Sequence, residues 1–204
     1  MKRCRLLILI AAAAASLTGC YTAPPWQRDP IDSSPGARVD FGDPVLNHRQ
    51  IFLFGDIDQR AAEVTIQKLL FLDGKSHEPI ELYLQTPGGE FKHAMAIEQT
   101  IRTLQSPVNT CAMSECNSGG VVLLAAGTGK RRAFHGSIIV VHGLKTYGRP
   151  PPGMKEHVQE TYTDFWRRRT KLPAAWLPLP PDVLHVLTAE QALDYGIVDE
   201  VVGK

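Results

Sequence analysis

Short runs of apolar residues alternate with segments of helical period over residues 49–142. The runs are typical of buried strands, and Gly55 ends the first of them. The segments between them repeat apolar residues three and four positions apart, which is typical of amphipathic helices. The pattern predicts strands at residues 51–54, 80–84, 108–113 and 137–142, and helices at residues 59–73, 91–104 and 118–126. Because the helices are long enough to connect parallel strands, we expect an α/β fold of repeated β-α units.

After His142 the regular alternation breaks, and proline-rich segments interrupt the chain. The last helix begins with a capping signal, since Thr188 is followed three residues later by Gln191. The pattern predicts proline-rich segments at residues 148–153 and 177–181, a polar helix at residues 154–170, a last helix at residues 188–196 and a short strand from residue 197.

The first twenty residues have the pattern of an export signal. A cationic start precedes a run of leucine, isoleucine and alanine. That run is too short for a hydrocarbon core of about 30 Å, which needs about 20 apolar residues, so we predict a signal peptide over residues 1–19. The run ends in Leu17-Thr18-Gly19-Cys20, which resembles a bacterial lipobox, whose cysteine is lipidated and becomes the first mature residue. A plain secreted protein or a buried N-terminal helix is the alternative.

Similarity to such lipoproteins implies a place in the cell. Cys20 would carry acyl chains, and Tyr21, which is not acidic, favours the outer membrane. The mature chain would then lie on the periplasmic side of the membrane, where ATP is not available. Residues 20–48 contain five prolines and little apolar periodicity, which predicts a tether before a domain at residues 49–204. The alternative is a short strand near Phe41 that docks on the domain.

Composition excludes several classes of protein. The 204 residues include 44% hydrophobic and 21% charged residues, close to the globular average. Lys and Arg number 22 against 21 Asp and Glu, so we expect no nucleic-acid partner. Four cysteines are too few for a disulfide scaffold. We expect Cys111 and Cys116 to be buried thiols, and a disulfide between them is the alternative. The histidines and cysteines lack metal-ligand spacing, so we expect no metal and no cofactor.

A serine between a strand and a helix is the first candidate for chemistry. Ser118 follows the strand predicted to begin at residue 108 and precedes a helix whose first N–H groups have no acceptor in the helix. Those N–H groups can stabilise an oxyanion, and the pair Gly88-Gly89 allows a second close approach of the backbone. His142 ends a predicted strand and is the candidate base.

Residues 51–142 resemble the Clp protease proteolytic subunit (ClpP) along almost the whole stretch and nearly without gaps. The resemblance depends on Thr86-Pro87-Gly88-Gly89, on Ser118-Gly119-Gly120 and on a C-terminal match over residues 188–199. Further matching segments lie at residues 51–58, 69–72, 80–84, 94–97, 123–127 and 129–131. The resemblance implies the ClpP/crotonase-like fold, with a helical arm between His142 and the last helix.

The same resemblance implies roles for individual residues. Ser118 falls on the nucleophile, His142 on the general base, and the amides of Gly89 and Gly119 on the oxyanion hole. The third member of the family's triad is an aspartate, but Leu184 occupies the position in register. Asp182, two residues earlier, takes this role if the loop carries a small insertion. The alternative is that Asp182 is a surface loop residue and that the site is a weaker Ser–His dyad or inactive.

Two more differences from ClpP concern the proteins with which the chain assembles. The segment after His142 is shorter than in ClpP and contains three consecutive prolines, so we expect a homo-oligomer without assuming the family's double ring. The family's usual partner is an ATP-driven unfoldase, which we do not expect at a periplasmic membrane surface.

The sequence therefore predicts a membrane-anchored, ATP-independent periplasmic serine peptidase that acts on peptides or unfolded protein segments. The alternative is a catalytically inactive ClpP-like module that binds or scaffolds in the cell envelope. A crotonase-like acyl-CoA enzyme is a third interpretation, disfavoured because it needs a cytoplasmic thioester pool.

Overall fold

The structure of the protein is a computed structural model that describes residues 41–145 and 151–203. The predicted signal peptide, Cys20 and the tether up to residue 40 lie outside the described residues. The elements are α1 (Pro44–Asn47), β1 (Gln50–Phe54), α2 (Gln59–Lys75), β2 (Ile80–Thr86), α3 (Phe91–Thr103), β3 (Val108–Asn117), α4 (Gly119–Ala126), β4 (Arg131–Phe134), β5 (Ile138–Val141), α5 (Met154–Arg169), a 3-10 turn (Ala174–Trp176), β6 (His185–Thr188), α6 (Ala189–Asp194) and β7 (Glu200–Val202). This alternation confirms the predicted α/β class.

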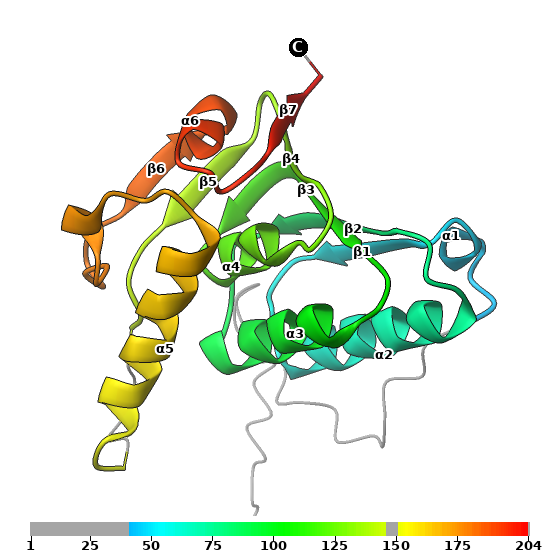
Figure 1. The fold of residues 1–204 in the computed structure, drawn as a ribbon, viewed down its shortest axis with the longest axis horizontal. Helices are drawn as coiled ribbons and strands as arrows, with labels where there is room; N and C mark the ends of the chain where they lie inside the picture. Colours follow the sequence, from blue (N-terminus) through cyan, green and yellow to red (C-terminus); the bar gives the residue numbers. More distant parts are fainter. Residues whose placement is uncertain (1–40, 146–150, 204) are drawn as a thin grey trace, which may run out of the picture. The chain divides into compact units, whose positions relative to one another are not determined.

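The described strands form one mostly parallel sheet that branches at β3 (Figure 1). The first half of β3 pairs with β4, through residues 110–112, and the second half pairs with β5, through residues 115–117. β1 and β2 continue the sheet on one side, β7 pairs with β4, and β6 pairs antiparallel with β5. Because β3 has ten residues, its end reaches past β4 and brings Ser118 beside β5.

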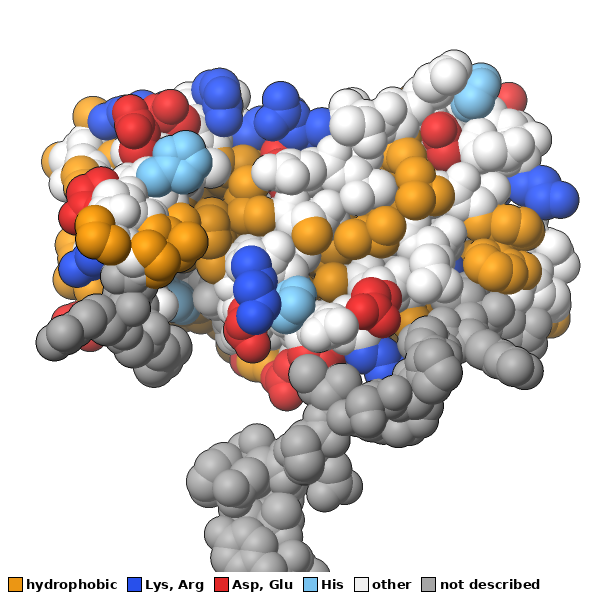
Figure 2. Space-filling model, turned by 90° about the horizontal axis from the view of Figure 1, so that it is seen from below, with side chains coloured by type: hydrophobic (Ala, Val, Ile, Leu, Met, Phe, Trp, Pro, Cys, Tyr) orange, Lys and Arg blue, Asp and Glu red, His pale blue; other side chains and the backbone are white. Residues whose placement is uncertain are grey.

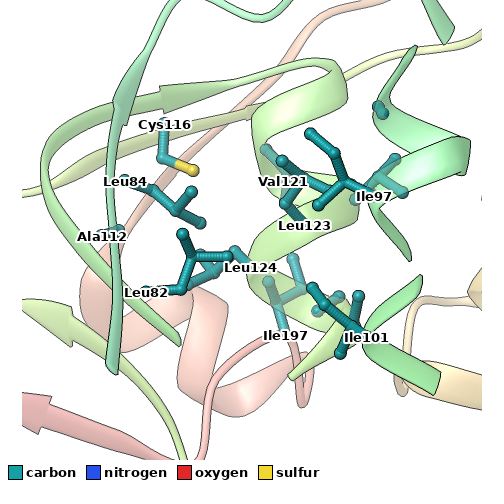
Figure 3. Close-up of a cluster of buried hydrophobic side chains, with 14 of the residues drawn as sticks. Leu82, Leu84, Ile97, Ile101, Ala112, Cys116, Val121, Leu123, Leu124 and Ile197 are labelled. Atoms are coloured by element: carbon teal, nitrogen blue, oxygen red, sulfur yellow. The ribbon is translucent and has the colours of Figure 1, made fainter. Parts of the chain in front are cut away.

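Helix α4 is the centre of the hydrophobic core. All eight of its residues are buried, which explains its run of small and apolar side chains. Figure 3 shows α4 side chains between β2 and β3 on one side and α3 on the other. The labelled core residues are Leu82, Leu84, Ile97, Ile101, Ala112, Cys116, Val121, Leu123, Leu124 and Ile197. This packing fixes the start of α4, and therefore Ser118, relative to the sheet.

Helices α2 and α3 lie side by side below the sheet in the view of Figure 1. Each buries one stripe, which in α2 consists of Ala62, Thr65, Leu69 and Leu72. On the face seen from below, hydrophobic side chains form separate groups among charged and polar ones (Figure 2). Both helices are therefore amphipathic, as their sequence pattern predicts. In the part of the chain that is described, no helix is both long and apolar enough to cross a membrane.

The periodicity does not predict β4 or β6. Only Ala133 is buried in β4, and only Leu187 in β6, so neither strand has an apolar run. Both arginines of β4 form ion pairs, Arg131 with Asp199 and Arg132 with Glu81. These short strands depend on partners far away in the sequence.

Residues 41–48, the last part of the predicted tether, pack on the domain. Asp43 caps the short helix α1, and Leu46 is 2% exposed within the core. The ring of Phe41 lies 4.5 Å from that of Phe71 on α2, measured between centroids. The segment contacts the domain through Phe41 and the short helix α1, and not as the strand considered as the alternative.

Candidate active site

Ser118 lies in a sharp turn between β3 and α4. Its backbone angles are φ +52° and ψ −119°, a conformation that residues with a side chain rarely adopt. Its N–H donates to Val140 of β5, at 2.9 Å, and its carbonyl accepts from Val121 of α4, at 3.0 Å. The side chain makes no capping bond to its own helix. The hydroxyl is therefore raised by a strained turn and left available, as nucleophilic chemistry requires.

The turn before α3 packs directly against Ser118. Gly88 has φ +106°, and a Cβ atom at this position would lie 2.6 Å from the Cβ of Ser118. Thr86 fixes the turn because its hydroxyl accepts from the N–H of Gly88 at 3.0 Å. Glycine is needed at 88 both for the backbone conformation and for the close approach of two chain segments.

Two main-chain amides lie together beside the serine. A Cβ atom on Gly119 would be 3.7 Å from the nitrogen of Gly89, so the two residues are close neighbours. Within the described residues, neither the Gly89 N–H nor the Gly119 N–H donates a hydrogen bond. Gly119 is also the first residue of α4, where the positive end of the helix dipole lies. The two N–H groups, which the sequence nominates for an oxyanion hole, are therefore available to donate to a negatively charged oxygen beside Ser118.

His142 directly follows β5, and its ring is held by the main chain. Its Nδ1 lies 2.7 Å from the carbonyl oxygen of Gly143. Its own carbonyl accepts a hydrogen bond of 2.7 Å from the hydroxyl of Tyr162. A carbonyl oxygen only accepts, so this contact is a hydrogen bond when Nδ1 carries the proton, which in the neutral ring leaves the lone pair of Nε2 free.

Four of the predicted site residues line one cleft of about 690 Å³: Ser118, His142, Gly89 and Gly119. Its apolar lining comes from Phe91, Val122, Leu144, Met154, Val158 and Tyr162. Lys92, Lys145 and Lys155 also line the cleft, and Lys92 forms an ion pair of 2.7 Å with Glu90. Among the described side chains, no hydrogen bond joins Ser118 to His142. Catalytic hydrogen bonds often tighten only when substrate binds.

Asp182, the fifth predicted residue, is not brought to this cleft. It is exposed in the turn before β6, and the structure records no bond between it and His142. Leu184, at the register position of the family's aspartate, is 57% exposed. The Gly143 carbonyl occupies the hydrogen-bonding position on His142 Nδ1 instead. Sequence reasoning missed this group because a main-chain carbonyl leaves no signature in the residue types.

Cys111 and Cys116 are free and buried, which confirms the expected thiols. Burial raises the pKa of the Cys116 thiol well above its usual range, so it is not a nucleophile at neutral pH. In the two described ranges of the chain, no group of three His, Cys, Asp or Glu side chains is arranged to hold a metal ion.

Comparison with known proteins gives a consistent result. The family model described as Clp protease matches residues 37–204. The chain is 30% identical over 167 residues to the ATP-dependent Clp protease proteolytic subunit of Deinococcus radiodurans, covering 78% of this chain and 82% of the relative. Subunit 1 of Corynebacterium glutamicum is 33% identical over 167 residues, covering 77% and 80%. Subunit 2 of Streptomyces avermitilis is 30% identical over 203 residues, covering 91% and 97%.

Proposed function

Because the chain belongs to the Clp protease family, we propose that it hydrolyses peptide bonds with Ser118 as nucleophile and His142 as general base. The turn at Ser118 is the observation that carries this proposal. It combines an uncapped serine hydroxyl, a strained backbone and two adjacent N–H groups without acceptors among the described residues. These are the elements that acyl transfer through a serine requires.

In the proposed reaction, Nε2 of His142 takes the proton of the Ser118 hydroxyl as its oxygen attacks the peptide carbonyl. The N–H groups of Gly89 and Gly119 donate to the oxyanion of the tetrahedral intermediate. The imidazolium then gives its proton to the leaving amine, and an acyl-enzyme remains. Water attacks the ester with His142 again as base, which releases the acid and restores the serine.

The proposed substrates are peptides and unfolded protein segments. The cleft is bounded by the α3 start, by α4 and by α5, and its apolar lining suits side chains of an extended chain. We propose that the peptide adds as a strand beside the turn at Gly88-Gly89. Two of the cleft lysines, Lys145 and Lys155, have no recorded ion pair among the described residues, so the cleft favours neutral or acidic peptides.

We further propose that Cys20 anchors the protein to the periplasmic side of the outer membrane through lipid. The sequence pattern of residues 1–20 supports this location. Since ATP is not available there, proteolysis would not depend on an ATP-driven unfoldase. The protein would in this respect differ from relatives whose names describe them as ATP-dependent.

A fluorophosphonate probe tests the proposed activity. The full-length protein in detergent should be labelled on one serine, which mass spectrometry should identify as Ser118. The variant Ser118→Ala should lose both the label and peptide hydrolysis. Ser114→Ala removes an exposed serine from β3, the strand before Ser118, and is the matched control. It should keep both the label and peptide hydrolysis.

The absence of labelling in a correctly folded protein would contradict the proposal. It would favour the inactive binding module. That alternative is motivated by Leu184, which stands where the family has its catalytic aspartate.

A further inference from the structure

We propose that the main-chain carbonyl of Gly143 orients the His142 imidazole in place of a carboxylate, and that Tyr162 is the positioning residue that holds the peptide group before this carbonyl. This inference rests on the proposed function, since it concerns the base of the same site. It explains how a site can keep its histidine aligned although no aspartate reaches it.

The first step concerns the ring itself. Nδ1 of His142 and the oxygen of Gly143 are 2.7 Å apart, an ordinary hydrogen-bond distance. Because the carbonyl cannot donate, this contact selects the tautomer with the proton on Nδ1. That tautomer is the one a general base needs, since Nε2 then accepts the proton of Ser118.

The second step concerns the peptide group between His142 and Gly143. Its carbonyl end accepts from the hydroxyl of Tyr162 at 2.7 Å. Its N–H end donates to the carbonyl of Pro180 at 3.0 Å. Both polar ends of the group are therefore fixed by segments outside β5. This holds the start of Gly143, the residue whose carbonyl contacts the ring.

The third step concerns the rigidity of Tyr162. Its side chain on α5 is 3% exposed and lies edge-on to the rings of Phe91, at 5.4 Å, and Trp166, at 5.6 Å. The phenol is protonated at neutral pH, and burial raises its pKa further, so the hydroxyl keeps the proton that it donates to His142. The aromatic packing holds the ring in this position.

The fourth step concerns the proline-rich segment before β6. A Cβ atom on Gly143 would overlap the carbonyl of Leu179, so this segment lies directly on residue 143. Only glycine fits there without displacing the chain. The same segment that leaves Asp182 exposed thus supplies the Pro180 carbonyl that fixes the peptide group.

Nitrogen-15 NMR of histidine in the full-length protein tests the inference. The His142 signal is assigned by its absence in His142→Gln. We expect the neutral ring as the Nδ1–H tautomer in the wild type and in Asp182→Ala, and a mixture of tautomers in Tyr162→Phe. Tyr195→Phe is the matched control, because that hydroxyl makes no hydrogen bond with described residues, and it should leave the signal unchanged.

Kinetics gives a second readout. Losing one hydrogen bond to the main chain should lower kcat of Tyr162→Phe roughly five- to tenfold while KM changes less than about twofold, since orientation and not binding is affected. An Nε2–H tautomer in the wild type, a shift in Asp182→Ala, or an unchanged signal in Tyr162→Phe would each overturn the inference.

The two proposals fail in different ways. The tautomer is read without turnover, so a protein with oriented His142 but no labelling of Ser118 would contradict only the peptidase. An active peptidase with the other tautomer would contradict only the role of Gly143 and Tyr162. If Tyr162→Phe does not fold, the wild-type and Asp182→Ala spectra still decide whether the Gly143 carbonyl orients His142.

Discussion

At the scale of single residues, the backbone of Ser118 is the feature that most constrains the site. With φ +52°, this residue is held by Val140, by Val121 and by the close packing of Gly88. A non-glycine residue in such a conformation costs about 1–3 kcal/mol, which the surrounding structure must offset. The strain aims the hydroxyl away from the capping position of α4 and into the cleft.

The stored strain can be measured with two inactive variants. Ser118→Gly should be more stable than Ser118→Ala by about 1 kcal/mol, because glycine removes the strain but adds some entropy to the unfolded chain. Urea unfolding of both variants checks this difference. Ser114 lies in β3 and has no positive φ. At this position the alanine variant should be more stable than the glycine variant. If Ser118→Ala were as stable as Ser118→Gly, the backbone of this turn would not be strained.

At the scale of elements, α3 buries a carboxyl within its apolar stripe. Glu98 is 2% exposed, beside Ile97 and Ile101, and its Oε2 has no hydrogen-bond partner among the described residues. Its Oε1 lies 3.8 Å from the guanidinium of Arg102. Burial raises the pKa of Glu98, although Arg102 and two other arginines lower it in part.

This carboxyl should make stability depend on pH. A folded pKa above the ordinary value of about 4.3 means that the folded state binds the proton more tightly than the unfolded state. The contribution of Glu98 to the free energy of unfolding is therefore most favourable below about pH 4.3, and it is lost as the pH rises through the raised pKa of the folded state. Glu98→Gln should be more stable than the wild type at pH 7, and this advantage should shrink by pH 5.

Chemical denaturation at the two pH values measures this effect. Glu160→Gln, which changes an exposed carboxyl on α5, is the matched control and should show no such change. If the free energy of unfolding depended on pH equally in Glu98→Gln and in the wild type, the buried carboxyl of Glu98 would not be the cause of that dependence.

The length of β3 is decided at the same scale. Apolar residues predict a strand only to residue 113, because Ser114 and Glu115 are polar. The structure continues the strand to Asn117, since its second half pairs with β5. Pairing with β5, and not the local sequence, therefore brings Ser118 close to the chain that leads to His142.

At the scale of the whole molecule, the anchor proposed at Cys20 would hold the protein at a membrane surface. Acyl chains contribute about 0.8 kcal/mol per buried methylene, so several chains hold a protein on a membrane firmly. Growth with an alkyne-labelled fatty acid should label the wild type and Cys4→Ala, but not Cys20→Ala. Cys4→Ala is the matched control because it changes the other cysteine among the first twenty residues.

The mass of the mature protein completes this test. It should correspond to a chain that begins with a lipidated residue 20. A label that persists in Cys20→Ala, or a mature chain that starts elsewhere, would contradict the anchor.

The sequence by itself determines the order of the main helices and strands, the capping box at Thr188, and the candidates Ser118 and His142. These features depend on local periodicity and on short motifs, which residue types record directly. The structure brings both candidates to one cleft with Gly89 and Gly119.

Only the tertiary structure decides how His142 is oriented. The sequence favours Asp182 because a side-chain carboxyl is visible in it, whereas the carbonyl of Gly143 is common to every residue. The peptide group that precedes this carbonyl is held by Tyr162, 20 positions from His142, and by Pro180, 37 positions from Gly143. Contacts of this kind arise only when distant segments pack, so no local pattern contains them.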